Sequence, residues 1–151
     1  DRRRGDAGGG VNTVEFAGTN YLAIAAAAAA SFLFGSVYYM ALAKPWRAAI
    51  GKTEEQIKTD GMKPSVFIVA ALAQLVIAWV LSGVIGHLGT DQVTVTNGLI
   101  SAGFIWVGFV ATTLAVNHGF QGAPKSLTVI DGGHWLGVLL IQGLVIGLFG
   151  V

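Results

Sequence analysis

The chain has 151 residues, of which 54% are hydrophobic and 11% are charged, and its formal net charge is +1. This length fits one domain, the composition is too apolar for an ordinary soluble protein, and the small charge without a basic stripe argues against a nucleic-acid partner. The absence of cysteine excludes disulfides, thiolate metal ligands, iron–sulfur clusters and a cysteine nucleophile. Crossing a bilayer takes about 20 apolar residues. Because four runs of this length are present, we expect an all-α polytopic membrane protein with four transmembrane helices.

The first residues of the chain differ in composition from everything that follows. Residues 1–16 are rich in charge and glycine, so they predict a disordered polar tail. Residues 17–151 are expected to form a single four-helix transmembrane domain. The first span, about residues 21–43, is too long for the apolar core of a signal peptide and follows a long tail, so we expect a retained helix. Tyr39, Lys44 and Trp46 mark its exit as interface anchors because these side chains combine apolar and polar parts.

The segment between Pro45 and Pro64 is the only sizeable polar loop in the chain. Gly51 fits a helix C-cap, and Thr53 followed by Gln56 has the pattern of a capping box that opens a helix closed by Gly61. This pattern predicts two short helices that lie at the membrane interface. They serve either as a solvated connector or as a docking surface for a partner.

The later spans are expected at about residues 65–86, 98–117 and 128–150. Lys and Arg residues concentrate in the loops after the first and third spans, although three arginines lie in the tail on the opposite side. Cytoplasmic loops carry the excess of Lys and Arg in membrane proteins. The distribution therefore predicts a multi-pass protein of the bacterial inner membrane, with the large loop in the cytoplasm and both termini in the periplasm.

Glycines gather on one face of the last span when it is treated as a helix. At about 100° per residue they fall within a sector of roughly 140°, which includes two GxxxG spacings. Such a face favours close packing against another helix, either in the same chain or in another subunit. The predicted helix-packing residues are Gly133, Gly137, Gly143 and Gly147, together with Gly108 in a stripe of small residues on the third span.

The other side of the last span carries polar residues. Asp131 and Gln142 lie about 20° apart on it, and His134 lies roughly 60° from Asp131. With Asn117 and His118 at the end of the third span, they form the candidate polar site. Two kinds of role are open for these residues. Asp131 either holds His134 in place through a hydrogen bond or caps the last helix, or the five residues together form a proton or ion path. A metal site of His118, Asp131 and His134 is the third possibility, but no compact ligand motif accompanies them, so no metal or other cofactor is expected.

Motifs that would indicate an enzyme are missing from the sequence. It contains no glycine-rich phosphate loop, no GxSxG elbow and no HExxH pair. No serine or histidine is arranged as a nucleophile with its base. We therefore expect the protein not to be an enzyme.

Several short motifs follow one another in a fixed order: NYLAI from Asn20, GSVYY from Gly35, PWRAAIGKTEEQIK from Pro45, IWVGFVATT from Ile105 and IDGGHWL from Ile130. From Asn20 onwards their order and spacing resemble the bacterial family called domain of unknown function seventeen-sixty-one. The resemblance implies a small four-span integral membrane protein and supplies no mechanism. Two features depart from that family. One is the tail, and the other is the Tyr-Tyr pair that ends GSVYY at Tyr39, where a Trp-Tyr pair is common.

These observations favour a non-enzymatic integral membrane protein. It is expected to self-assemble, or to act as an accessory subunit of a larger membrane complex, through its Gly/Ala-rich helix faces. The alternative is a small transporter or channel that moves protons or small ions along the polar face around Asp131 and His134. The expected partners are the lipid bilayer and either further copies of the chain or other membrane protein subunits.

Overall fold

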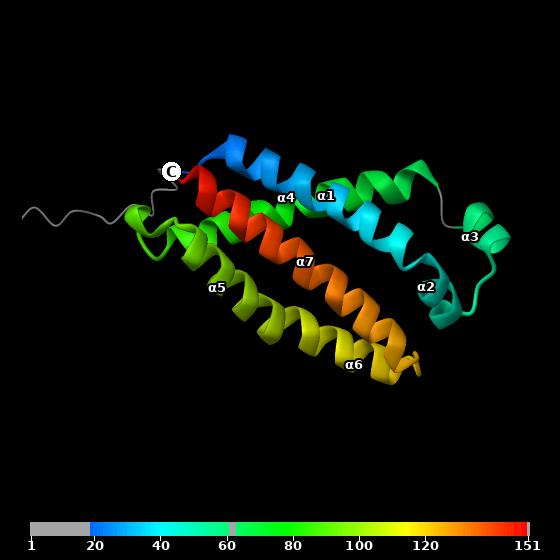
Figure 1. Cartoon of the computed structure of the whole chain (residues 1–151). Coiled ribbons are helices and arrows are strands. Elements are labelled where there is room, and N and C mark those ends of the chain that lie inside the picture. Colours follow the sequence, from blue (N-terminus) through cyan, green and yellow to red (C-terminus); the bar gives the residue numbers. More distant parts are fainter. Residues whose placement is uncertain (1–18, 61–62, 151) are drawn as a thin grey trace, which may run out of the picture.

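A computed structural model describes residues 19–60 and 63–150 of the chain (Figure 1). The predicted polar tail, residues 1–16, and the predicted helix end at Gly61 lie outside these ranges. The described residues are helical with short turns and contain no β-strand. Four helical stretches are long and apolar enough to cross a membrane: Tyr21–Ala41, Pro64–Gly86, Val95–Phe120 and Lys125–Phe149. The predicted all-α fold with four candidate spans is confirmed.

Helix α1 (Tyr21–Ala41) begins where its sequence supplies an N-cap. The Asn20 side chain accepts a hydrogen bond of 3.0 Å from the Ala23 backbone N–H, which would otherwise lack a partner. Small residues dominate its buried face, which contains Ala23, Ile24, Ala27, Ala28, Ser31 and Gly35. These side chains allow neighbouring helices to approach α1 closely.

Two short helices follow, α2 (Ala43–Ile50) and α3 (Glu54–Asp60), and neither buries a residue. Gly51 ends α2 with a left-handed φ of 66°, a conformation that glycine adopts without a steric penalty. The Thr53 backbone N–H donates to Gln56 Oε1 at 2.9 Å, and the Gln56 backbone N–H donates to Thr53 Oγ1 at 3.3 Å. The predicted C-cap and capping box are therefore both present.

Exposed ion pairs link α2 to α3. Glu54 lies 2.8 Å from Arg47 and 3.0 Å from Lys58. Lys58, and then Arg47, hold the pKa of the Glu54 carboxyl below its usual range. Pairs of this kind in water stabilise a fold only slightly, so the connection between α2 and α3 depends mainly on the capping groups.

The third span is one continuous helical stretch with a change of winding in its middle. It consists of α5 (Val95–Ile105), the π-helical segment η2 (Trp106–Ala111) and α6 (Thr112–Phe120). Helix α4 (Pro64–Gly86) precedes it, joined through the short 3₁₀ turn η1 (Thr90–Gln92), and α7 (Lys125–Phe149) ends the fold. A π-helical segment re-aims the side chains that follow it, so α6 does not continue the face of α5.

Helix α7 lies in the middle of the arrangement, between α1 and α5, while α4 packs against α1 (Figure 1). We call the end where α4 leads into η1 and α5 the α4–α5 end, and the opposite end the α2–α3 end. The hydrophobic core is concentrated toward the α4–α5 end. Its buried members are Ile24, Ala27, Ala28, Ala78, Leu81, Ile85, Ala102, Leu139 and Ile146.

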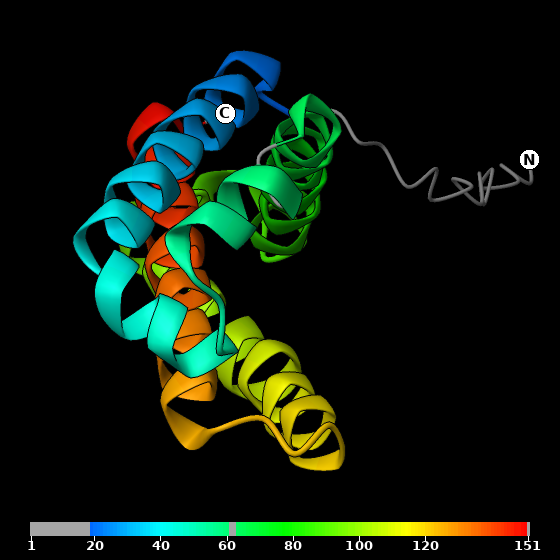
Figure 2. The same cartoon turned by 90° about the vertical axis from the view of Figure 1, so that its right-hand side faces the viewer.

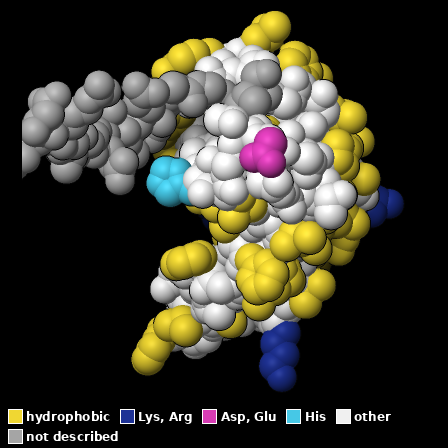
Figure 3. Space-filling model, turned by 90° about the vertical axis from the view of Figure 1, so that its left-hand side faces the viewer, with side chains coloured by type: hydrophobic (Ala, Val, Ile, Leu, Met, Phe, Trp, Pro, Cys, Tyr) yellow, Lys and Arg dark blue, Asp and Glu magenta, His cyan; other side chains and the backbone are white. Residues whose placement is uncertain are grey.

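The helices diverge toward the α2–α3 end. Phe67, Gln74 and Ala78 lie on one face of α4, because spacings of seven and eleven residues return to the same side of a helix. Ala78 and Gln74 are 0% and 5% exposed, whereas Phe67 is 48% exposed. In Figure 2 α4 and α6 lie well apart, and Figure 3 shows the surface hollowed on the same side. The inward face of α4 therefore has no neighbouring helix before Gln74.

Candidate functional site

Asp131 lies inside α7 rather than at its start. The helix begins at Lys125 with Pro124 as its N-cap residue, so the prediction that Asp131 caps this helix is wrong. Asp131 Oδ1 accepts a hydrogen bond of 2.9 Å from the Tyr39 hydroxyl, and Oδ2 lies 3.9 Å from His118 Nε2. The Asp131 and His118 side chains are 20% and 13% exposed. A carboxylate inside a spanning helix thus has one hydroxyl donor and one imidazole as its neighbours.

His134 does not donate to Asp131 the hydrogen bond that was one of the predicted alternatives. The Asp131 carboxylate is directed to α1 and α6 instead, where the Tyr39 hydroxyl donates to it and the His118 imidazole lies nearby. His134 is 7% exposed and its Nδ1 has no hydrogen-bond partner. Its Nε2 lies against α1, where a Cβ on Gly35 would be only 2.7 Å away. The close approach of this ring to α1 therefore requires glycine at position 35.

Aromatic rings surround the His134 imidazole. The centroids of Tyr39 and Tyr38 lie 4.8 Å and 5.8 Å from it, and that of Trp135 lies 5.0 Å away. Phe34 stacks nearly parallel to it at 6.3 Å. The sequence predicted Tyr39 as an interface anchor, and the structure places it and three further rings from α1 and α7 around this imidazole.

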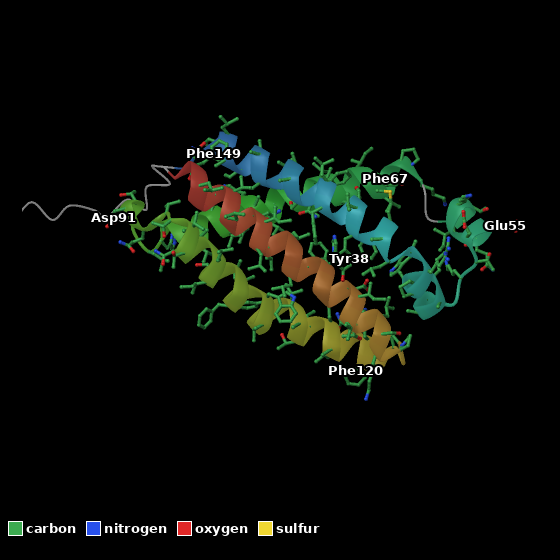
Figure 4. All side chains as sticks on the ribbon, viewed as in Figure 1. Tyr38, Glu55, Phe67, Asp91, Phe120 and Phe149 are labelled. Carbon is green, nitrogen blue, oxygen red and sulfur yellow. The ribbon has the colours of Figure 1, made fainter. Side chains whose placement is uncertain are left out.

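Two side chains bind the backbone of α7 from opposite sides at this level. The Tyr38 hydroxyl donates to the Ile130 carbonyl at 2.9 Å, and Figure 4 shows this tyrosine between α1 and α7. Trp106 Nε1, from the π-helical segment, donates to the Gly132 carbonyl at 2.8 Å. Both donors are partly buried polar tips of aromatic side chains, which need a partner in hydrocarbon. They hold α1 and η2 at fixed heights along α7.

The remaining predicted residues differ in how they are placed around Asp131. His118 Nδ1 is 3.0 Å from the Thr128 hydroxyl, so this histidine connects α6 to α7. The neighbouring Asn117 is exposed on α6, since its position on the helix turns it away from α7. Trp46 packs on Tyr39 with ring centroids 5.5 Å apart, whereas Lys44 is exposed. In the described part of the chain no three His, Asp or Glu side chains are close enough to hold a metal ion, so the hypothetical metal site is not formed.

Gln142 belongs to a separate cluster about 16 Å further along α7 from Asp131. Its Nε2 donates toward Ser31 Oγ at 2.9 Å, Gln74 Oε1 at 2.9 Å and the Gln74 carbonyl at 3.1 Å. Ser31 Oγ in turn donates to Gln74 Oε1 at 2.9 Å. One amide nitrogen with two hydrogens therefore has three acceptors within reach, while Gln142 Oε1 has no hydrogen-bond partner. The cluster links α1, α4 and α7 in the middle of the apolar core.

The glycines of α7 are packed against helices of the same chain. A Cβ on Gly133 or Gly137 would meet the Tyr38 hydroxyl or the Phe34 ring on α1. On the other side Gly143 touches the backbone of Gly98, and Gly147 touches the backbone around Thr94. Gly108 differs from its predicted role. It is exposed in η2, and a Cβ there would meet no atom within 4 Å.

Sequence reasoning missed Ser31 and Gln74 as partners of Gln142, and Tyr38 and Trp106 as donors to α7. A usable signal existed for the first pair, because each is an isolated polar side chain near the middle of an apolar span. Such groups must find a hydrogen-bond partner in hydrocarbon. The donors to α7 gave no such signal, since aromatic residues also occur at membrane boundaries without specific partners.

Comparison with known proteins gives one result that bears on this architecture. A family model described as "Protein of unknown function (DUF1761)" matches residues 22–147. No curated protein and no solved structure matches the chain.

Proposed function

The chain belongs to the family of proteins of unknown function DUF1761 and has four helices that can cross a membrane, and we propose that it is a non-enzymatic membrane protein that assembles with a second copy of itself. The assembly surface is the side where α4 and α6 diverge. The observation that carries the proposal is that the inward face of α4 is exposed before Gln74 although the same face is buried after it. A neighbouring helix from another chain would complete this face.

The position of the glycines determines which surface remains for assembly. The sequence favoured assembly through the glycine face of α7, but Gly133, Gly137, Gly143 and Gly147 are in contact with α1 and α5 of the same chain. That face is therefore not free for another subunit. Of the candidate spans, Val95–Phe120 is the least buried within the chain. In an apolar stretch of 18 residues, 6% of it is buried, against 39% for Lys125–Phe149.

The two helices that border the open side are complementary in the size of their side chains. The inward face of α4 presents Phe67, a large apolar side chain. The third span presents small residues, since Gly108, Thr112 and Ala115 are exposed. Large side chains against small ones allow two helices to approach closely, and this packing drives association in lipid.

A two-fold arrangement makes use of both surfaces at once. The first half of α4 and all of α6 lie at the α2–α3 end, so they occupy the same depth in the membrane (Figures 1 and 2). A two-fold axis along the membrane normal would place α4 of each copy against α6 of the other. Such an interface is isologous and closes on itself, which gives a dimer rather than a chain of subunits.

The charges favour one orientation for this dimer. Basic side chains gather at the α2–α3 end. Helix α2 carries Lys44 and Arg47, the turn after it carries Lys52, α3 carries Lys58, and Lys125 begins α7 at the same end. The opposite end carries Asp91 and His87, and its described residues include no Lys or Arg. Figure 3 views the fold from this end and shows Lys and Arg side chains at the outline. Because Lys and Arg mark cytoplasmic loops, we propose that the α2–α3 end faces the cytoplasm and both chain ends face the periplasm.

Cross-linking between differently tagged copies tests the proposal directly, because the chain has no cysteine of its own. One copy carries Phe67→Cys and the other carries Thr112→Cys, and both are produced in the same membrane. We expect an oxidant to link them into a species that contains both tags. The matched control replaces Phe67→Cys by Leu33→Cys, which places the thiol on an exposed α1 position, 66% exposed, away from the proposed interface.

Two outcomes would overturn the dimer. Equal linking in the test and the control would indicate random collision in the membrane. A product in which either cysteine is joined to a protein of another mass would show that a different subunit covers the open side, and the chain would then be an accessory subunit.

Movement of protons or small ions along the polar face is the alternative function. The residues that it needs are divided into two groups, one around Asp131 and His134 and one around Gln142. Between them along α7 lie Val138 and Leu139, which are buried apolar side chains. Assembly is therefore better supported by the geometry than passage along α7.

A further inference from the structure

We propose that Asp131, His118 and His134 form a reversible proton-binding site in the membrane, which holds one proton among the three side chains. The inference does not depend on the proposed dimer, because these groups lie on α6 and α7 and are covered by α1 of the same chain. Its ligand is a proton, taken up from the α2–α3 end.

The charge of Asp131 is the first reason. Among the described residues, the ion pairs of Arg and Lys are formed with Glu54 and Asp60. The ionic neighbour of Asp131 is the imidazole of His118 at 3.9 Å. With both imidazoles neutral the site carries an uncompensated negative charge inside a spanning helix, which is costly. One proton, on an imidazole or on the carboxylate, makes the site neutral.

The environment of His134 is the second reason. A buried ring nitrogen without a hydrogen-bond partner, such as His134 Nδ1, destabilises a fold unless a water or another ligand satisfies it. The rings of Tyr38, Tyr39 and Trp135 lie within 6 Å of the imidazole centroid. These rings meet the imidazole tilted or edge-on. His134 Nδ1 thus makes no hydrogen bond that would compete with a proton.

The other groups around the site do not replace the proton. Helix α1 contributes the hydroxyls of Tyr38 and Tyr39, which donate to Ile130 O and to Asp131. Helix α2, which also packs on α7, carries Arg47, which is paired with Glu54, and Lys44, which is exposed. Helix α7 carries Lys125 at its start, which is exposed, and the ion pair of Asp131 is with His118 instead. Helices α4 and α5 and the segment η2 contain no titratable side chain. The countercharge for Asp131 must therefore come from a proton on this cluster.

A route for the proton exists at the α2–α3 end. His118 and Asp131 are both slightly exposed, whereas His134, one helical turn further along α7, is buried. Asp131 lies about 9 Å from the start of α7 and His134 about 14 Å. Toward the other end of α7 the buried Val138 and Leu139 follow. The site therefore exchanges protons with one side of the membrane, and this is a binding site rather than a path across it.

Spectroscopy of the full chain in lipid bilayers tests the proposal, with His87→Gln as the background so that His118 and His134 are the remaining histidines. The ¹⁵N spectrum of labelled histidine reports a protonated imidazole, and the infrared spectrum reports a protonated carboxylic acid. We expect one of these two signals at neutral pH, its loss at high pH, and its loss at neutral pH in Asp131→Asn. The matched control Asp91→Asn, at the opposite end of the fold, should keep the signal.

The proposal is overturned if both imidazoles are neutral and the carboxylate is ionised at neutral pH, or if the signal persists in Asp131→Asn. Should Asp131→Asn fail to fold, Tyr39→Phe provides a second measurement. It removes a hydroxyl that stabilises the ionised carboxylate and keeps the charge, so the proton should be released at higher pH than in the background protein. An unchanged release pH would show that the cluster has only a structural role.

Discussion

The two ends of the helix bundle are held together by different contacts. At the α4–α5 end backbone touches backbone, since Gly143 packs on Gly98 and Gly147 packs on the chain around Thr94. At the α2–α3 end the contacts with α7 are made by side chains, such as Tyr38 on the Ile130 carbonyl and Trp106 on the Gly132 carbonyl. Close glycine contacts exclude other atoms and seal one end. Longer side-chain contacts leave the other end more open, and this is the end at which we propose a partner helix and a proton-binding site.

The largest effect should come from adding one methyl group at the sealed end. In Gly143→Ala the new Cβ would overlap the carbonyl of Gly98, which is backbone and cannot turn away. Overpacking of this kind typically costs about 1–3 kcal/mol, and we expect the upper part of that range. The measurement is the unfolding free energy in detergent micelles.

The matched variant for this prediction is Gly108→Ala in the third span. A Cβ at position 108 would meet no atom within 4 Å, so its stability should equal or slightly exceed that of the wild type, because alanine favours a helix more than glycine does. If both variants lost the same stability, the contrast between a sealed and an open end would be wrong.

A smaller effect is expected at the polar cluster that lies between the two ends. Gln142→Met keeps the length of the side chain but removes the donor to Ser31 and Gln74. The loss should be about 1–2 kcal/mol, as found for buried hydrogen bonds between membrane helices. The unfolding free energies of Gln142→Met, Gln74→Met and the double variant measure the coupling.

The double variant distinguishes a hydrogen-bonded cluster from simple packing. If the amides bind each other, Gln142→Met should cost less in a chain that already carries Gln74→Met, because one of the three acceptors of Gln142, Gln74 Oε1, has gone. Additive losses would mean that the two side chains only fill space.

The smallest effect is expected outside the membrane. Glu54→Gln removes the exposed ion pairs with Arg47 and Lys58, and the unfolding temperature at neutral pH should stay close to that of the wild type. Lys58 and Arg47 lower the pKa of Glu54 in the folded chain. Any stabilisation is therefore present above the unfolded pKa of a glutamate and disappears as the pH falls through the lower, folded value. A large fall in the unfolding temperature at neutral pH would show that these ion pairs, and not only the capping groups, stabilise the α2–α3 connection.

Local features of the fold were predictable because their causes are local. The capping box at Thr53 and Gln56 is formed by residues three positions apart, and Gly51 adopts the left-handed conformation that ends α2. The four spans follow from the length of their apolar runs. The third span is longer than predicted, extending three residues further at each end, since Thr94 caps α5 through the Asn97 backbone N–H at 3.3 Å.

The candidate site was predictable only as a set of residues on one helix. Periodicity placed Asp131, His134 and Gln142 on one side of α7, but it does not identify what lies opposite. The hydroxyl that binds Asp131 comes from Tyr39, 92 positions earlier in the chain, and Gln142 binds Ser31, 111 positions earlier. Because of these distant partners, Asp131 is not bonded to His134 and Gln142 belongs to a different cluster.

The sequence by itself determined that the helices of this protein lie in a bilayer, and which faces of the last helix can pack against other helices. Long apolar runs require a bilayer, and the angular separation of glycines from polar residues on α7 follows from the helical repeat. Only the tertiary structure decided which helices occupy those directions. In lipid, apolar helices gain little by choosing one apolar neighbour over another, so the choice depends on close backbone contacts and on hydrogen bonds between distant residues. Those contacts use the glycine face within the chain, leave the start of α4 exposed, and place the Asp131 carboxylate beside the Tyr39 hydroxyl and the His118 imidazole.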